Sequence, residues 1–334
     1  MTTITDIANE CGTSITTVSK VLNGNDRKIG SATKARVNEA IARLGYKPNA
    51  AARGLRKQRA NCIGICMRAH QVSTEYFAMI IDALLDEAAR LGQGLMLFSS
   101  SPGRQDDPQR LMFADGRCDG LLFLSEPDTR VVEALNRVGV PAVALHDGAL
   151  PSGASSIDVD NVQIGYDTTK YLLGLGHRKI VFLNTSTDRP YGEQRCQGYR
   201  RAMTEAALKA VSFGDRAHAV DAYEFALQIA DNPQQVTAII TVTDNAALRV
   251  LLAFAARGMR VPEDMSVVGI DGLFAGEISV PPLTTMSQRP RELAIAAMRA
   301  LLDRIEHPGL PAAHVKWEAQ LVVRASAGPP RKVS

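Results

Sequence analysis

Apolar residues recur at helical spacing in three short stretches at the start of the chain. In 4–11 they occupy the i, i+3, i+4 and i+7 positions of one helix face, and Gly12 follows the last of them. A second stripe runs through 16–23, after Ser14 as an N-cap, and a third runs through 37–44. Two short helices about three residues apart, covered by a third, have the spacing of a helix-turn-helix. Any small helical bundle would show the same stripes.

From residue 61 the pattern changes to short apolar runs separated by helical stripes. The predicted strands are CIGIC, LMLF, 120–124 and PAVAL, followed by a second series of KIVFL, TAIIT and MSVVGID. The predicted helices between them include 76–91, 193–208 and 245–257. Strands that alternate with helices indicate an α/β fold, here with two lobes that are each a doubly wound parallel sheet. The carboxyl ends of such strands line the cleft in which a small molecule binds.

Charge is distributed unevenly along the chain. The formal net charge is +3, but residues 1–60 hold eleven Lys or Arg against four Asp or Glu, a net +7 that leaves −4 for the remainder. A basic head on a mildly acidic body suggests that the head meets a polyanion. A solvated basic face would give the same count.

Length and composition place the chain among globular proteins of two or three packed units. It has 334 residues, of which 46% are hydrophobic, and no apolar run approaches the ~20 residues of a membrane span. The start MTTITDIANE lacks the basic flank and the apolar stretch of a signal peptide. We therefore expect a cytoplasmic protein with no membrane partner.

The sequence lacks the motifs that mark several enzyme classes. It contains no GxGxxG, GxxxxGK[ST], HExxH or GxSxG pattern, and its five cysteines include no CxxC pair. We expect reduced cysteines, no metal, no cofactor and no catalytic residue. The alternative is an enzyme that acts on a small polar metabolite with a nucleotide-fold body, which turnover of the ligand would reveal. A periplasmic solute-binding protein conflicts with the basic head and the missing signal peptide.

Two strings carry a specific family resemblance. The run ITDIANECGTSITTVSKVLNG, followed by ARVNEAIARLGYKPNAAARGLR, resembles the DNA-binding head and hinge of the lactose repressor/galactose repressor (LacI/GalR) family of bacterial transcription regulators. The resemblance continues to about residue 325 and implies a periplasmic-binding-protein-like core. One departure precedes the third helix, where the turn is longer and Gly30 replaces the capping Ser of the family, which weakens the cap.

The polar face of the second helix is the predicted DNA-reading surface. By the resemblance, Ile15, Thr16 and Lys20 read bases in the major groove, where Ile15 suits a thymine methyl and Lys20 a guanine edge. Phosphate contacts are expected from the neighbouring polar residues Ser14, Thr17, Ser19 and Asn23. A core or solvent role stays open for each of these side chains.

The alanine-rich segment 48–56 is too short for a stable isolated helix, so it should order only with a partner. The resemblance implies a hinge helix that pairs across a dimer, with Leu55 wedged into the minor groove and Arg53 and Arg56 as further DNA contacts. A docking contact is the alternative role of Leu55.

The resemblance also implies an effector site between the lobes. Its matched positions are Tyr76, Phe77, His146, Asp160, Arg189, Tyr191, Arg195, Asp244, Asp271 and Gln288. Carboxylates can accept hydrogen bonds from ligand hydroxyls or amines, and arginine can donate to ligand oxygens. Core aromatics at 76 and 77, and a helix N-cap at Asp244, are the alternatives. At His146 many family members have Asp.

The predicted organisation is a helix-turn-helix domain at 1–48, a hinge at 49–60 and an effector-binding core at 61–328. The first lobe is expected at about 61–161 plus 291–305, and the second at about 162–290 plus 306–328. We predict a transcriptional repressor that binds a palindromic operator in double-stranded DNA as a homodimer. A small metabolite, a sugar or a sugar acid, is its expected effector.

Overall fold

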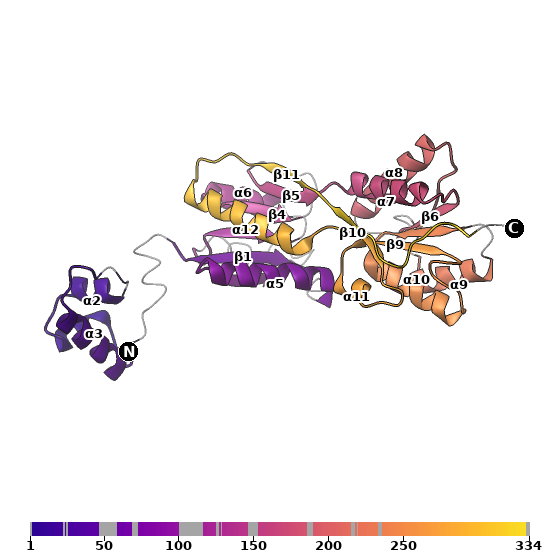
Figure 1. Cartoon of the computed structure of the whole chain (residues 1–334). Coiled ribbons are helices and arrows are strands. Elements are labelled where there is room, and N and C mark those ends of the chain that lie inside the picture. Colours follow the sequence, from indigo (N-terminus) through magenta and orange to yellow (C-terminus); the bar gives the residue numbers. More distant parts are fainter. Residues whose placement is uncertain are drawn as a thin grey trace. The chain divides into compact units, whose positions relative to one another are not determined.

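The computed structural model divides into two compact units, Met1–Asn61 and Cys62–Ser334, which are drawn in Figure 1. The structure describes residues 2–22, 24, 26–46, 59–68, 73–99, 116–124, 127, 129–145, 153–185, 190–214, 218, 220–232 and 236–331. The predicted hinge at 49–60 lies outside these ranges except for its last two residues. Each unit is described by itself.

The first unit contains the three predicted helices, α1 (Ile4–Glu10), α2 (Ile15–Leu22) and α3 (Ser31–Arg43). Its small core is built on the fully buried side chains of Ile7, Val18 and Val37, one from each helix. A capping box between Thr3 and Asp6 begins α1. As expected, Gly30 begins α3 without a side-chain cap.

Two six-stranded sheets form the second unit. The first has the order β11-β5-β4-β3-β1-β2, and the second has the order β12-β10-β9-β8-β6-β7. The first comprises β1 (Cys62–Met67), β2 (Gly94–Ser99), β3 (Gly120–Phe123), β4 (Ala142–Leu145), β5 (Ser155–Val159) and β11 (His314–Trp317). The second comprises β6 (Ile180–Leu183), β7 (Val211–Phe213), β8 (Ala238–Thr241), β9 (Ser266–Asp271), β10 (Thr284–Ser287) and β12 (Gln320–Val322). All neighbours are parallel except β10 and β12. The predicted two-lobed α/β fold is confirmed.

Helices cover both faces of each sheet, because successive strand residues point to opposite faces. Ile63 and Ile65 of β1 pack with α5 (Glu75–Arg90) and α12 (Pro290–Glu306), whereas Cys66 packs with α6 (Thr129–Arg137). On the second sheet, α7 (Asn161–Gly174) and α8 (Pro190–Glu205) share one core. The other face carries α9 (Ala222–Asp231) and α10 (Asp244–Ala256), and the short α11 (Phe274–Glu277) follows β9.

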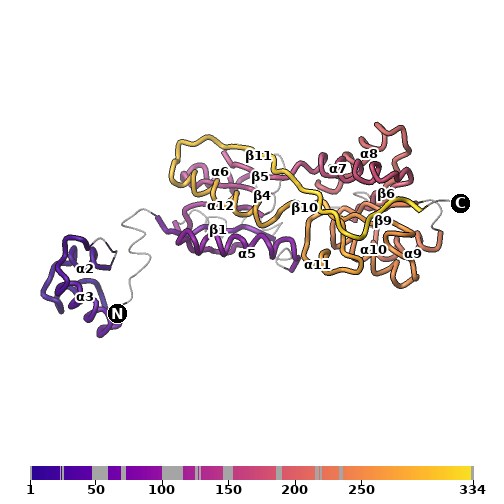
Figure 2. The backbone as a smooth tube through the Cα atoms, viewed as in Figure 1, coloured from indigo at the N-terminus to yellow at the C-terminus, as the bar shows by residue number. Residues whose placement is uncertain are grey.

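The chain passes between the sheets three times, after β5, after β10 and between β11 and β12, and its course can be followed in Figure 2. This order corrects one predicted boundary, since 306–328 was assigned whole to the second lobe. Residues 314–317 instead extend the first sheet, where Val315 lies opposite Ile157. The parallel edge of β5 offers backbone partners to the extended chain that leaves α12, and only the assembled sheet creates that edge.

Among the described residues, no helix has the length and apolar character to cross a membrane. Within the same ranges, no group of three or more His, Cys, Asp or Glu side chains is placed to hold a metal ion. All five cysteines are free thiols.

Candidate functional site

Helix α2 presents a buried and an exposed face, which positions the residues predicted to read DNA. Val18 is fully buried, whereas Thr16 and Lys20 are exposed and Ile15 is 45% exposed although it is apolar. An apolar side chain held open to solvent beside a cation is the arrangement that contact with base edges would use. The three side chains predicted to read bases therefore lie outside the core of the first unit.

The hydroxyls at the start of α2 serve the helix itself. Ser14 Oγ accepts from the Thr17 backbone N–H at 3.1 Å and lies 2.9 Å from Thr17 Oγ1, so Ser14 is the N-cap. Ser19 is half-buried. The other predicted DNA contacts, Asn23, Arg53, Leu55 and Arg56, lie outside the described residues.

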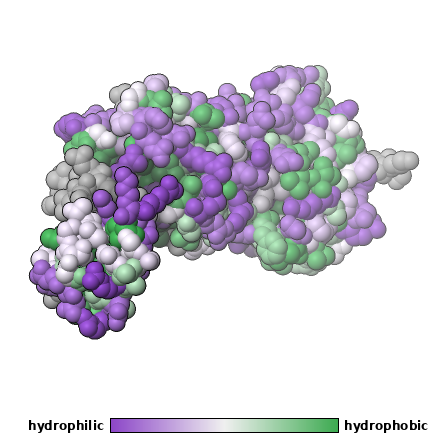
Figure 3. All heavy atoms as spheres, turned by 60° about the vertical axis from the view of Figure 1, so that its left-hand side comes forward, coloured by the Kyte–Doolittle hydropathy of each residue, from purple (hydrophilic) through white to green (hydrophobic). Residues whose placement is uncertain are grey.

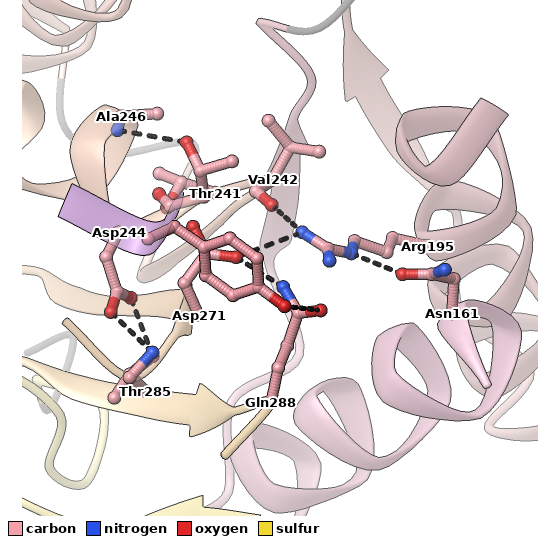
Figure 4. Close-up of polar contacts among 12 residues, drawn as sticks. Asn161, Arg195, Thr241, Val242, Asp244, Ala246, Asp271, Thr285 and Gln288 are labelled. Carbon is pink, nitrogen blue, oxygen red and sulfur yellow. Dashed lines mark hydrogen bonds and ion pairs between the residues drawn. The ribbon is translucent and has the colours of Figure 1, made fainter. Parts of the chain in front are cut away.

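Arg195 is the centre of a second polar cluster, at the carboxyl ends of the strands of the second sheet (Figure 4). The residue is 2% exposed, and its Nε donates to Asn161 Oδ1 at 2.9 Å. Its Nη1 donates to the Val242 carbonyl at 2.5 Å and lies 3.6 Å from Asp271 Oδ1. The Tyr191 ring lies under the guanidinium, with Cζ 4.8 Å from the ring centroid. The fork of Arg195 is therefore held in one orientation.

A chain of hydrogen bonds connects this cluster to the first sheet. Gln288 Nε2 donates to Asp271 Oδ1 at 2.6 Å, and Tyr76 Oη donates to Gln288 Oε1 at 3.1 Å. Tyr76 belongs to the first turn of α5, whereas Gln288 directly follows β10. The Ala275 backbone N–H also donates to Glu75 Oε1 at 3.1 Å. Side chains from both lobes thus meet at one place.

Burial controls the electrostatics of Asp271. Loss of solvent raises the pKa of its carboxyl to about 7, the positive charge of Arg195 lowers it, and the negative charge of Asp244 raises it. Asp271 also has a positive φ of 142°, which an L residue adopts rarely. Its charge and its backbone conformation both depend on the surrounding fold, as is typical of residues at functional sites.

The Asp244 carboxylate forms its hydrogen bonds with other partners, although Asp244 lies close enough to Asp271 to affect its pKa. Its Oδ2 accepts from the backbone N–H groups of Gly272 and Leu273, both at 2.8 Å, and its Oδ1 accepts from Thr285 Oγ1 at 2.6 Å. Asp244 is not the N-cap of α10, because Thr243 holds that position. The carboxylate instead ties the turn after β9 to β10, and Figure 4 shows it beside Thr285.

Of the remaining predicted effector residues, some lie at the cluster and others do not. Tyr191 contacts Arg195, and Phe77 packs edge-on against Tyr76, with ring centroids 5.4 Å apart, at the margin of the first core. Asp160 is the exposed N-cap of α7 and accepts from the Gln163 backbone N–H at 2.9 Å. His146 and Arg189 lie outside the described residues.

Two buried polar residues near the site were not predicted from the sequence. Asn161 anchors Arg195, and Asp158 of β5 is 2% exposed, with Lys316 Nζ 3.9 Å from its carboxylate. Burial raises the pKa of the Tyr76 phenol, and the negative charges of Asp271 and Asp158 raise it further. Asn161 and Asp158 both belong to the string DVDN, of which only Asp160 was predicted to line the site. A polar residue inside a buried strand was the available signal.

Comparison with known proteins decides the family. A family model described as "Bacterial regulatory proteins, lacI family" matches residues 3–49, and one for a periplasmic binding protein-like domain matches 169–327. The repressor PurR of Mannheimia succiniciproducens is 32% identical over 336 residues, which is 98% of each chain. The chain belongs to the LacI family. A second relative, the regulator RegA of Clostridium saccharobutylicum, is 30% identical and covers 97% of this chain and 99% of its own.

Two solved structures of transcription regulators match nearly the whole chain. A complex of the transcriptional regulator CelR with cellobiose is 28% identical, with a TM-score of 0.67, and covers 98% of this chain and all of that one. The lac repressor dimer bound to operator and an anti-inducer has a TM-score of 0.82 over 98% of this chain and 99% of its own. At 24% identity, the second likeness speaks for the fold alone. The chain is thus a LacI-family repressor, with a helix-turn-helix region followed by a periplasmic binding protein-like core.

Proposed function

We propose that this chain is a transcriptional repressor that binds a palindromic operator as a homodimer and responds to a small polyhydroxylated ligand held around Arg195. The observation that carries the effector proposal is the polar chain Tyr76–Gln288–Asp271–Arg195, which consists of two hydrogen bonds and one ion pair and joins both lobes. The protein acts in the cytoplasm, on DNA, and does not turn over its ligand. Its repressor relatives support this reading over the enzyme alternative.

Hydroxyl groups suit this cluster because each can donate and accept a hydrogen bond. A polyol would accept from Arg195 and Gln288 and donate to Asp271, while the Tyr191 ring offers an apolar face. A sugar acid would add a carboxylate for Arg195 or for Arg189. The cellobiose complex of CelR, which is 28% identical, supports a carbohydrate. We keep Phe77 and His146 as further proposed contacts, and we withdraw Asp244 because its carboxylate is fully engaged by the chain.

Ligand binding changes the balance of contacts between the lobes. A ligand hydroxyl that bonds Gln288 competes with the hydrogen bond from Tyr76. When that bond is lost, the hydrogen bond between Glu75 and the Ala275 backbone has one contact fewer beside it to hold the two lobes together. A ligand shifts such an equilibrium by its difference in affinity for the two arrangements. We propose that this shift is passed to the head through the hinge, whose Leu55, Arg53 and Arg56 contact DNA.

A homodimer would cover apolar side chains that the described surface leaves exposed, and Figure 3 shows apolar residues among polar ones on one face. β2 is the outer strand of the first sheet and exposes Leu97, and Leu85 is exposed on the neighbouring α5. The second lobe exposes Leu252, Phe274, Ile278 and Val280. A two-fold dimer presents two identical α2 helices, which requires a palindromic operator.

A thermal-shift screen of the full chain tests the effector class. A carbohydrate that binds the cluster stabilises the protein by about 2.7 kcal/mol at a concentration of 100 times Kd. Sugars, sugar acids and heterocyclic bases form the three arms. Stabilisation by bases alone would overturn the carbohydrate proposal, and consumption of the ligand would favour the enzyme.

Substitution then tests the site with the ligand that the screen identifies. Arg195→Ala should lose the ligand-induced thermal shift, because the ligand oxygens are left without their donor at a cost of about 1–3 kcal/mol. Tyr76→Phe removes only the Oη hydrogen bond to Gln288 and should therefore have a smaller effect than Arg195→Ala. Arg249→Ala, which breaks the exposed pair with Asp221, should respond like the parent. Undiminished affinity in calorimetry of Arg195→Ala would remove Arg195 from the site.

A further inference from the structure

Two thiols lie together at the start of the first sheet. Cys62 is the first residue of β1, and Cys118 lies two residues before β3. The Cys118 thiol donates to Cys62 Sγ at 3.9 Å, and the Asp119 backbone N–H donates to the Cys62 carbonyl at 2.8 Å. Residues 56 positions apart in the chain are therefore joined by the sheet itself.

The packing holds Cys118 against β1. A Cβ atom at Gly64 would lie 3.3 Å from Cys118 Sγ and 2.8 Å from Phe98, so glycine is what lets this thiol approach the strand. Cys118 is 4% exposed, whereas Cys62 is half-buried. A reagent from solution thus meets Cys62 first, with Cys118 directly behind it.

We propose that Cys62 and Cys118 form a reversible disulfide when a hydroperoxide oxidises them, and that this oxidation weakens operator binding. The position of Cys62 argues for the second part, because the unit that contains the helix-turn-helix ends at Asn61. A disulfide would shorten the distance between the two sulfurs from 3.9 Å to about 2.0 Å. That movement displaces the residue through which the head is attached to the core. The effect on operator binding rests on the proposed function.

The chemistry needs only the two thiols and the hydroperoxide. The Cys62 thiolate attacks the peroxide O–O bond, which forms a sulfenic acid and releases the alcohol or water. The Cys118 thiolate then attacks the Cys62 sulfur and releases water, so two thiols are oxidised by two electrons and one hydroperoxide is reduced. The hydrogen bond from Cys118 favours Cys62 as the attacking thiol.

Burial of the two thiols also affects the rate of disulfide formation. It raises the pKa of Cys118 to about 12, with the negative charge of Asp119 raising it further and Arg117 lowering it, and burial raises the pKa of Cys62 as well. Since the thiolate is the reactive form, the disulfide should form faster as the pH rises from neutral toward 9.

Peptide mapping of the full chain tests the pair. The reduced protein is treated with hydrogen peroxide, alkylated with iodoacetamide and digested without reductant. We expect a linked peptide containing Cys62 and Cys118 that dithiothreitol removes, and its loss in Cys62→Ser and Cys118→Ser. Cys66→Ala, which changes the adjacent buried thiol, and Cys196→Ser, which lies in the other lobe, should keep it. Recovery of Cys62 and Cys118 as separate alkylated peptides after peroxide would overturn the proposal.

Operator affinity tests the consequence separately. The probe is the DNA duplex that the reduced protein selects from a random library. Oxidation should weaken binding about fivefold or more, dithiothreitol should restore it, and peroxide-treated Cys118→Ser should bind like its reduced form. A disulfide with unchanged affinity would overturn the regulatory step but not the modification site. Failure to select any duplex would instead overturn the proposed function.

Discussion

Asp244 and Asp271 both follow strands of the second sheet, yet their carboxylates have different partners. Asp244 accepts two backbone N–H bonds and one hydroxyl bond from its own chain. Asp271 accepts from Gln288 and lies beside Arg195, where a ligand could take over either contact. The role of each aspartate therefore follows from what the fold brings to its oxygens.

The structural role of Asp244 predicts a loss of stability rather than of ligand affinity. Asp244→Ala should lower the free energy of unfolding by about 2 kcal/mol or more, because the buried N–H groups of Gly272 and Leu273 then lose their acceptor. Asp160→Ala, which removes an exposed N-cap, should cost about 1 kcal/mol. Urea unfolding compares the two, and an Asp244→Ala variant as stable as the parent would contradict this role.

The raised pKa of Asp271 predicts a pH-dependent stability. The pKa is about 7 in the folded protein and about 4 in the unfolded chain, so the stabilisation is complete below pH 4 and is lost as the pH rises to 7. Asp271→Asn cannot ionise. Its stability relative to the parent should therefore increase by about 2 kcal/mol between pH 5 and pH 8. Unfolding curves across this range, with Asp160→Asn as the exposed control, measure the difference, and parallel curves would contradict it.

At the scale of elements, β2 is the exposed margin of the first sheet. One side of the strand pairs with β1, and in the sheet order no strand follows on the other side within the described residues. An edge strand with an exposed Leu97 invites association and is covered in a stable assembly.

A charge on this strand should separate the proposed dimer. Leu97→Lys places an ammonium on a side chain that is 56% exposed, so burying it between two copies becomes unfavourable. We expect light scattering to report a dimer for the parent and the 36.0 kDa monomer for the variant. Val138→Lys, at a residue that is 55% exposed beyond α6, should stay dimeric. A dimeric Leu97→Lys would place the interface elsewhere.

At the scale of the whole molecule, the charge distribution predicts that DNA binding and ligand binding respond differently to salt. The first 60 residues carry a net +7, and the remainder carries −4. Each phosphate that the head neutralises releases a counterion, so operator affinity should fall about 1,000-fold or more between 50 and 200 mM salt. Ligand affinity at the buried Arg195 should change little over the same range. Fluorescence anisotropy measures the first and calorimetry the second, and a flat DNA response would count against operator binding.

The hydrophobic pattern was enough to predict most of the helices and strands and their order. The stripes of 4–11 and 16–23 became α1 and α2, and the run CIGIC became β1, because burial at a fixed period is a local property of the chain. The positions of Tyr76, Arg195, Asp271 and Gln288 were also found from residue type and place after a strand or in a matched string. Shorter strands such as β7 and β11 were missed because few of their residues are buried.

The hydrogen-bond partners of the buried polar side chains depend on how the chain folds. Tyr76 and Gln288 are 212 positions apart, and nothing near either residue in the chain indicates that their side chains bond. The same is true of Asn161 and Arg195, of Asp244 and Thr285, and of Cys62 and Cys118. Local periodicity indicates which face of an element is buried. The ends of distant strands are brought together only when the two sheets form and the chain has passed between them three times. The energy of a buried polar group depends on those distant partners, so its role is fixed only when the chain has folded.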